Sequence, residues 1–167
     1  ITTEDGLSQG SVSTIIQDSR GYMWIGTGDG LNKYNGNKFE VYKYNGKENS
    51  ISGNSITDIK EDKEGNIWIG TTTGLSKINT VTDEITNYLP NEDGCNISHY
   101  RIREILISKN GDILVGTNDG LNRYNGNEFK VYKNIKNDEN EDTLVEIEVG
   151  QNEKIININI WPSFVDD

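Results

Sequence analysis

The sequence predicts an all-β protein built from repeats of a four-stranded antiparallel sheet. One pattern of 15 residues occurs three times, beginning at Gly21, Gly65 and Gly111, so the copies are 44 and 46 residues apart. Runs rich in β-branched and aromatic residues alternate with Gly, Asn and Asp, which is typical of strands separated by turns. No stretch between these runs has the hydrophobic period of a long helix.

Each repeat contains four predicted strands. In the first repeat they cover residues 12–17, 23–26, 31–34 and 39–42. A four-stranded unit that recurs about every 40–50 residues is typical of a propeller blade. A single blade has two apolar faces, so it must stack against neighbours to bury them.

The sequence therefore predicts a β-propeller fragment of about three and a half blades. The three repeats lie near residues 10–44, 54–88 and 100–132. The tail at residues 133–167 contains two further strand-like runs but lacks the turn glycine and the Trp-containing motif. We interpret this tail as a degenerate or truncated fourth blade, whose first strand covers residues 142–149.

Recurring positions predict the structural residues of the repeat. Asp18 and Asp62 each begin a turn that ends in glycine, because an Asp side chain can accept a hydrogen bond from the backbone two residues on. The tryptophans are expected to fill the space between blades, and a glycine inside a strand indicates a close approach of another chain segment. The remaining structural positions are Trp24, Trp68, Leu114, Gly26, Gly70, Gly116, Gly30, Gly74 and Gly120.

The composition excludes several classes of partner. The formal net charge of −11 argues against binding to nucleic acid or to an anionic membrane surface. No apolar run approaches the ~18 residues needed to cross a bilayer, so we expect no membrane insertion of this segment. Cys95 is the single cysteine and leaves the redox compartment open.

No catalytic, cofactor or metal site is predicted. His99 is the single histidine, and neither it nor Cys95 lies in a recognisable arrangement of nucleophile, base and orienting group. The turn aspartates are expected to be structural rather than a facing glycosidase pair. Residues 138–142 space oxygen ligands like a calcium loop, but Thr143 and Val149 occupy the positions of the required Gly and Glu.

A ligand-binding surface is expected where the loops between repeats meet the turns between the second and third strands. In a propeller these segments share one face, and here they are polar and rich in Asn, which suits an oligosaccharide or another small polar ligand. Tyr and Arg are enriched in recognition sites. The predicted ligand-binding residues are His99, Tyr100, Arg101, Asp29, Asp119 and Tyr44.

The repeat resembles the two-component regulator propeller repeat. The pattern I-x-x-D-x-x-G-x-x-W-I-G-T-x-x-G-L-x-x-Y fits residues 18–34 and 62–78 well, whereas the third copy departs at Ser108 and Leu114. The resemblance covers roughly residues 1–132. In that family the repeats form seven-bladed propellers outside the cytoplasmic membrane. A β-sandwich domain, a membrane helix and a histidine kinase or, in some members, a cyclase output domain follow.

The resemblance implies the N-terminal fragment of a sensor region. Its function would be that of a non-catalytic, ligand-binding segment on the periplasmic or cell-surface side of a bacterial membrane receptor. Two alternatives stay open: a structural module for protein interaction and dimerisation, and a propeller enzyme that acts on polysaccharide. A pocket of convergent polar side chains would favour the sensor, a flat surface the structural module, and a close carboxylate pair the enzyme.

Incomplete blades also predict self-association. Known propellers have about 4–8 blades, so three and a half cannot close a ring. The open apolar faces and sheet edges would drive association. We expect a homodimer in which the first blade of each chain meets the incomplete blade of the other, with residues 1–3 adding an edge strand.

Overall fold

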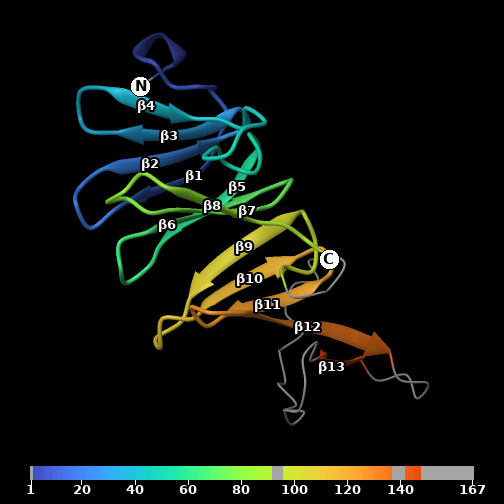
Figure 1. Cartoon of the computed structure of the whole chain (residues 1–167). Coiled ribbons are helices and arrows are strands. Elements are labelled where there is room, and N and C mark those ends of the chain that lie inside the picture. The colour runs from blue at the N-terminus through green and yellow to red at the C-terminus, as the bar shows by residue number, and fades with distance from the viewer. Residues whose placement is uncertain (1, 92–95, 137–141, 148–167) are drawn as a thin grey trace.

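Three antiparallel sheets follow one another along the chain and stack as a fan in the computed structural model, which describes residues 2–91, 96–136 and 142–147 (Figure 1). Blade 1 consists of β1 (Val12–Gln17), β2 (Met23–Thr27), β3 (Gly30–Tyr34) and β4 (Phe39–Tyr42). Blade 2 consists of β5 (Ile56–Glu61), β6 (Ile67–Thr71), β7 (Leu75–Ile78) and β8 (Ile85–Tyr88). Blade 3 consists of β9 (Ile102–Ile107), β10 (Ile113–Thr117), β11 (Gly120–Tyr124) and β12 (Phe129–Lys136). The predicted all-β propeller fragment is confirmed.

The tail differs from the predicted first strand of a fourth blade. β12 continues through the expected boundary at residue 132, and β13 (Asp142–Ile147) pairs antiparallel with it as a fifth strand of blade 3. An alternating apolar pattern suits an outer strand as well as an inner one, so the pattern did not identify the partner. The rest of 133–167, the calcium-like loop at 137–141 and Cys95 lie outside the described residues.

A short helix lies close to the N-terminus, where the sequence predicts an edge strand at residues 1–3 for the dimer. Thr3–Asp5 forms a short 3-10 helix (η1) whose start is fixed by a capping box, with the Thr2 N–H donating to the Asp5 carboxylate at 2.7 Å. Thr2 itself has an extended backbone, so strand addition by residues 1–3 to a second copy stays a prediction. Over the residues that the structure describes, no helix is long and apolar enough to cross a bilayer.

Hydrophobic cores fill the spaces between successive blades. Trp24 and Leu31 of blade 1 are buried against Ile59 of blade 2. Trp68 and its blade 2 neighbours pack in the same way against Ile102 and other apolar residues of blade 3. Both tryptophans therefore fill the space between blades, as predicted.

Glycines inside the second strands allow the blades to approach closely. A Cβ on Gly26 would lie 2.6 Å from Ile56 Cγ2, and a Cβ on Gly70 would lie 2.7 Å from Ile102 Cγ2. Either distance is well inside van der Waals contact, so only glycine fits. The close approach predicted for these two positions is confirmed, whereas a Cβ on Gly116 of blade 3 would meet, among the described residues, only the Glu104 carbonyl oxygen at 3.8 Å.

Candidate functional site

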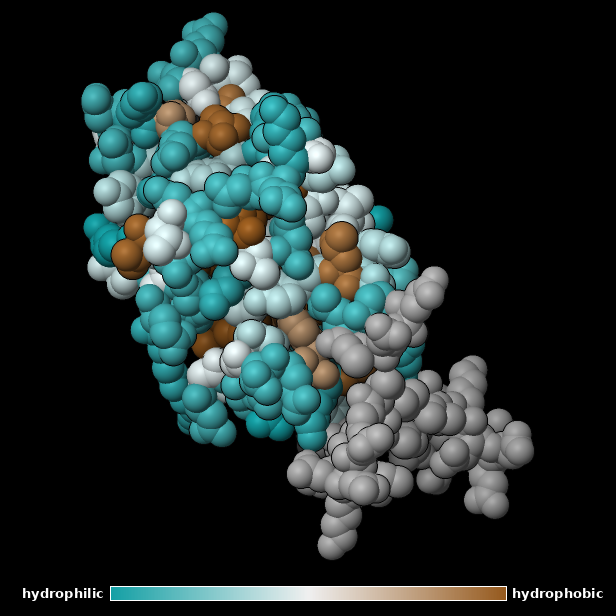
Figure 2. Space-filling view, in the orientation of Figure 1, coloured by the Kyte–Doolittle hydropathy of each residue, from teal (hydrophilic) through white to brown (hydrophobic). Residues whose placement is uncertain are grey.

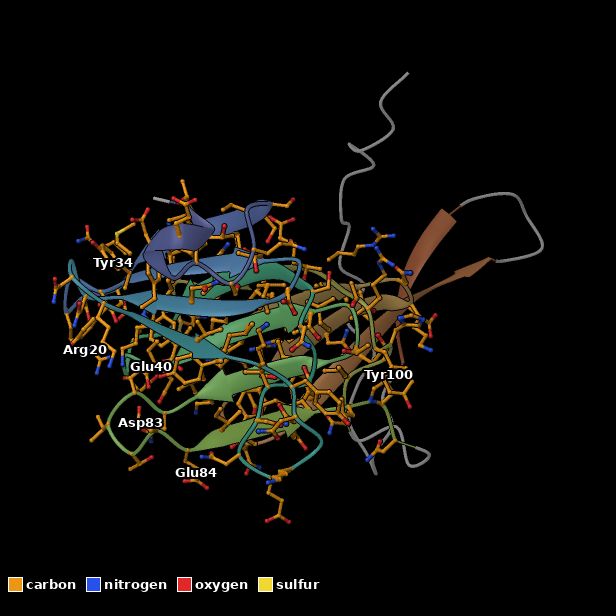
Figure 3. All side chains as sticks on the ribbon, turned by 90° about the horizontal axis from the view of Figure 1, so that it is seen from above. Arg20, Tyr34, Glu40, Asp83, Glu84 and Tyr100 are labelled. Atoms are coloured by element: carbon orange, nitrogen blue, oxygen red, sulfur yellow. The ribbon has the colours of Figure 1, made fainter. Side chains whose placement is uncertain are left out.

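The candidate site lies on the loop face, which we define as the end of the fan that carries the β2–β3, β6–β7 and β10–β11 turns and the β4–β5 and β8–β9 connections. Figure 3 shows Tyr100 at this end, and Arg20, Tyr34 and Asp83 at the opposite end, here called the turn face. Antiparallel order places alternate turns at opposite ends of each blade, so the predicted loop segments do share one face.

A polar network fixes the loops of this face to each blade. In blade 1 the Ser8 N–H donates to Asn32 Oδ1 at 2.8 Å, and the Ser8 hydroxyl lies 2.9 Å from Thr27 Oγ1. Asn32 Nδ2 also donates to the Ile25 carbonyl at 3.1 Å. The equivalent residues are Ser52, Thr71 and Ser76 in blade 2, and Ser98, Thr117 and Asn122 in blade 3.

This network was not predicted from the sequence. Its signal is an apolar residue followed by serine ahead of each repeat, at Leu7, Ile51 and Ile97, with the same spacing as the main motif. The apolar member is buried each time. The polar groups of this network form hydrogen bonds with one another, and these bonds hold the loops in place. Recognition of a ligand is therefore left to the side chains around the network.

Ion pairs occupy the ends of the loop face. Asp29 binds Lys43 with Oδ2 to Nζ at 2.7 Å, and both side chains are about half exposed. Asp119 pairs with Lys133 at the corresponding position of blade 3. In blade 2 Thr73 replaces the aspartate and donates to the Ser52 carbonyl at 2.8 Å. The charges near these turns are therefore balanced locally.

Two exposed tyrosines project from the connections between blades. The Tyr44 backbone N–H donates to Asn54 Oδ1 at 2.7 Å, which fixes the backbone below an exposed ring. Tyr100 is exposed in the next connection, with its ring centroid 6.5 Å from that of His99. The His99 Nδ1 accepts the Arg101 backbone N–H at 2.9 Å, so the imidazole orders this loop.

The structure divides the six predicted residues into two groups. The Asn118 N–H donates to the Arg101 carbonyl at 3.3 Å and so joins the β10–β11 turn to the β8–β9 connection. His99, Tyr100, Arg101 and Asp119 therefore lie together near blade 3. Asp29 lies in the β2–β3 turn of blade 1, and Tyr44 lies in the connection that follows β4 of that blade, as the repeat boundaries predict.

Three cavities lined by described residues lie away from the predicted residues, and none of the six contributes to their linings. A groove of about 350 Å³ between blades 2 and 3 opens on the turn face. A cavity of about 340 Å³ lies on blade 1, and one of about 620 Å³ on the outer strand of blade 2. Their linings include Asn66, Trp68, Lys77, Asp112 and Tyr124 in the groove, Tyr22, Lys33 and Phe39 in blade 1, and Asn49, Asp83 and Asn87 in blade 2.

The groove residues are engaged with one another. Arg123 beside the groove binds Asp112 with Nη2 to Oδ2 at 2.8 Å, and this hydrogen-bonded partner raises the pKa of the Arg123 guanidinium. The Lys77 ammonium lies 5.4 Å from the centroid of the Trp68 ring. The Trp68 indole N–H is bonded to Asp62. These contacts stabilise the turns, and they leave the exposed tyrosines of the loop face as the better recognition groups.

Figure 2 shows mostly hydrophilic residues on the face in view, with hydrophobic residues in small separate areas. The described carboxylates of the loop-face turns, Asp29 and Asp119, belong to blades 1 and 3 and each has its own lysine. The geometry thus offers rigid loops, aromatic rings and balanced charges.

Comparison with known proteins agrees with the repeat structure. The family model described as the two component regulator propeller matches residues 6–29 and 50–73, which overlap blades 1 and 2. The chain is 49% identical over 49 residues to the protein named Histidine kinase P4 of Formosa agariphila, a stretch that covers 29% of this chain and 4% of that protein.

A solved structure extends the similarity to most of the chain. The extracellular domain described as part of a hybrid two component system of B. thetaiotaomicron matches with a TM-score of 0.74 and 29% identity. The match covers 80% of this chain and 20% of that one, so this chain spans a small part of the proteins it resembles. The repeats, their spacing and the fold agree, and blades 1 and 2 therefore contain repeats of the two component regulator propeller family.

Proposed function

We propose that this chain is a non-catalytic, ligand-sensing segment of a signalling receptor and that its loop face binds a neutral polar ligand such as an oligosaccharide. The observation that carries this proposal is the pair of exposed tyrosines, Tyr44 and Tyr100, on connections whose backbone is held by hydrogen bonds to the side chains of Asn54 and His99. The similarity to an extracellular domain of a hybrid two component system supports a place on the periplasmic or cell-surface side of a bacterial membrane.

The chemistry of the loop face favours a neutral ligand. Tyrosine presents an apolar ring with a hydroxyl that donates and accepts hydrogen bonds, which suits sugar rings with their apolar faces and hydroxyl edges. Lys43 and Lys133 are each bound to an aspartate, so these cations are already compensated. The net charge of −11 further disfavours anionic ligands.

The separation of the carboxylates supports a role without catalysis. Glycosidases hold two carboxyl groups roughly 5–10 Å apart across the scissile bond. Asp29 and Asp119 instead sit on different blades and are paired with lysine. A reducing-sugar assay checks this part of the proposal. Hydrolysis by the wild-type chain that disappears in the Asp29→Asn/Asp119→Asn variant would contradict it.

Thermal unfolding in the presence of tetrasaccharides of glucose, xylose, mannose and galactose tests ligand binding. A ligand that binds the folded state at 100 times its Kd adds about 2.7 kcal/mol to the unfolding free energy, so the melting temperature rises. We expect such a rise for the wild type with at least one sugar, and its loss in the Tyr44→Ala/Tyr100→Ala variant.

Val81→Ala is the matched control, because Val81 is also an exposed large side chain but lies in the β7–β8 turn of the turn face. This variant should respond to the sugar as the wild type does. Absence of a shift with every sugar, or an undiminished shift in the double tyrosine variant, would overturn the proposed site.

A further inference from the structure

An arginine crosses the junction between blades 1 and 2 on the turn face (Figure 3). Arg20, in the β1–β2 turn, donates from Nη2 to Asp18 Oδ2 at 3.3 Å and from Nη1 to the Thr80 carbonyl of blade 2 at 2.9 Å. Its guanidinium carbon also lies 5.6 Å from the centroid of the Tyr22 ring. This junction therefore contains a guanidinium group that contacts a carboxylate, a carbonyl and an aromatic ring.

The junction between blades 2 and 3 lacks this arginine. Glu64 occupies the repeat position of Arg20, and Asn66 replaces the tyrosine that the guanidinium contacts, so both side chains are shorter than their counterparts. Glu64, Asn66 and Gly126 line the groove of about 350 Å³ between blades 2 and 3. Gly126 corresponds in the repeat to the residue whose carbonyl binds Arg20. The groove thus lies where the other junction holds its guanidinium.

Three oxygen acceptors of the groove can take further hydrogen bonds. Asn66 is 8% exposed and donates from Nδ2 to Asp62 Oδ2 at 2.9 Å, whereas no described residue donates to its Oδ1. The Glu64 carboxylate is exposed and forms no ion pair with a described residue. The Gly126 carbonyl accepts the Tyr124 hydroxyl at 3.0 Å, and a carbonyl oxygen has a second lone pair. The groove therefore suits a ligand that donates hydrogen bonds.

An aromatic ring and a lysine also line the groove. The Tyr124 ring has its centroid 5.6 Å from that of Trp68, and aromatic rings attract guanidinium groups. The Lys77 ammonium lies 5.4 Å from the centroid of the Trp68 ring. Its counterpart Lys33 lies 4.9 Å from the centroid of the ring that Arg20 contacts. A lysine at this repeat position is therefore compatible with a guanidinium beside it.

We propose that the groove between blades 2 and 3 binds a guanidinium group of a ligand, in the place that Arg20 occupies between blades 1 and 2. A guanidinium has five N–H donors and no acceptor, and its planar fork can bind the Glu64 carboxylate with two hydrogen bonds. The groove volume lies within the range of roughly 300–1,000 Å³ for small-ligand sites, and the net charge of −11 attracts cations. This site does not depend on sugar binding at the loop face.

Calorimetric titration of the wild-type chain tests the site and separates two sources of the guanidinium. The probes are ethylguanidinium, which stands for a small guanidino compound, and a capped peptide with one arginine between glycines, which stands for an arginine of another polypeptide. Binding of ethylguanidinium would assign the groove to a small compound, and binding of the peptide alone would assign it to a polypeptide. Binding of neither probe would overturn the proposal.

Matched ligands separate recognition of the guanidinium from attraction of any cation. Ethylammonium and a lysine peptide keep the positive charge but lack the planar fork, whereas ethylurea and a citrulline peptide keep a planar group without the charge. Each should bind at least about ten-fold more weakly than the guanidinium probe, because it loses charged hydrogen bonds to the groove. Equal affinity for the ammonium and guanidinium probes would show nonspecific attraction to an acidic chain and would overturn the site.

Variants of Glu64 locate the site on the chain. Glu64→Gln should raise the Kd at least about ten-fold, and Glu64→Arg should abolish binding, because it restores the residue that fills the other junction. Glu84→Gln is the matched control, since Glu84 is an exposed carboxylate of the turn face outside the groove (Figure 3).

Equal affinities of Glu64→Gln and Glu84→Gln would overturn the proposal. Amide spectra of the wild type give a second readout that does not depend on any variant. The bound probe should shift the signals of Gly111 and Gly126, which line the groove. Shifts confined to residues outside the groove would place the cation elsewhere and overturn the site.

Discussion

The indole N–H of Trp68 donates a 2.8 Å hydrogen bond to Oδ2 of Asp62. The same carboxylate accepts the Asn66 N–H at 2.8 Å, so one aspartate fixes both the β5–β6 turn and the tryptophan that fills the space between blades. In blade 3 Ser108 and Leu114 replace these two residues together. The aspartate and tryptophan therefore act as one unit of the repeat.

A double-mutant cycle with Asp62→Ala and Trp68→Phe measures this unit. Hydrogen bonds to charged groups contribute roughly 1.5–3 kcal/mol. We expect a coupling free energy of about that size from chemical denaturation of the two single variants and the double variant. Additive effects within about 0.5 kcal/mol would show that the two residues stabilise the fold independently.

Truncating the side chain at the tryptophan position of the repeat should destabilise the fold more in blade 2 than in blade 3. Trp68→Ala is expected to lower the unfolding free energy by roughly 3–5 kcal/mol, as other large-to-small core substitutions do. Leu114→Ala is the matched control, because Leu114 occupies the same repeat position but is only half-buried. Equal losses for the two variants in urea denaturation would contradict the packing described here.

Gly65 ends the β5–β6 turn with φ of +79°, a left-handed conformation that side chains disfavour. Gly65→Ala should therefore lower the unfolding free energy by about 1–2 kcal/mol. Gly10→Ala serves as the control, since Gly10 is an exposed glycine outside the left-handed region, with no atom within 4 Å of an added Cβ. A Gly65→Ala variant as stable as Gly10→Ala would refute the role of this turn.

Acid should weaken the contact between blades 1 and 2. Burial would raise the pKa of Asp18, but hydrogen bonds from Trp24, Tyr22 and Arg20 together lower it below the ordinary value of 3.8. A carboxyl group whose pKa is lower in the folded state stabilises the fold at pH values above its unfolded-state pKa. This contribution is lost as the pH falls through the folded-state pKa. Unfolding free energies between pH 2 and 6 should fall more steeply with acid in the wild type than in Asp18→Asn. Parallel profiles would show that Asp18 does not contribute.

Much of the fold follows from local patterns. Trp24, Gly26 and Asp18 recur at fixed intervals, and turn chemistry and strand periodicity place the elements to within one residue in blade 1. The strand β13 shows the limit of such reasoning, because alternation specifies a strand but not which edge it joins. The hydrogen bond from the Trp24 indole N–H to the Asp18 carboxylate was also not predicted, because the turn alone accounts for an aspartate at this position.

The candidate site was less predictable. Blade order was enough to place Tyr44 and Tyr100 on one face, because antiparallel strands fix the end at which each loop emerges. Sequence alone did not show that Asp29 and Asp119 pair with the lysines 14 residues later, which requires the third hairpin to bring the side chains together. The groove between blades 2 and 3 depends on the packing of two blades and has no local signal.

Mapping a ligand by NMR tests the account of the loop face most directly. Backbone amide spectra of the labelled chain are recorded as the tetrasaccharide that raises the melting temperature is added. We predict shift changes concentrated at Tyr44 and at residues 99–101. Changes concentrated at Lys77 and Tyr124, which line the groove on the turn face, would contradict the account and move the site to the opposite end of the fan.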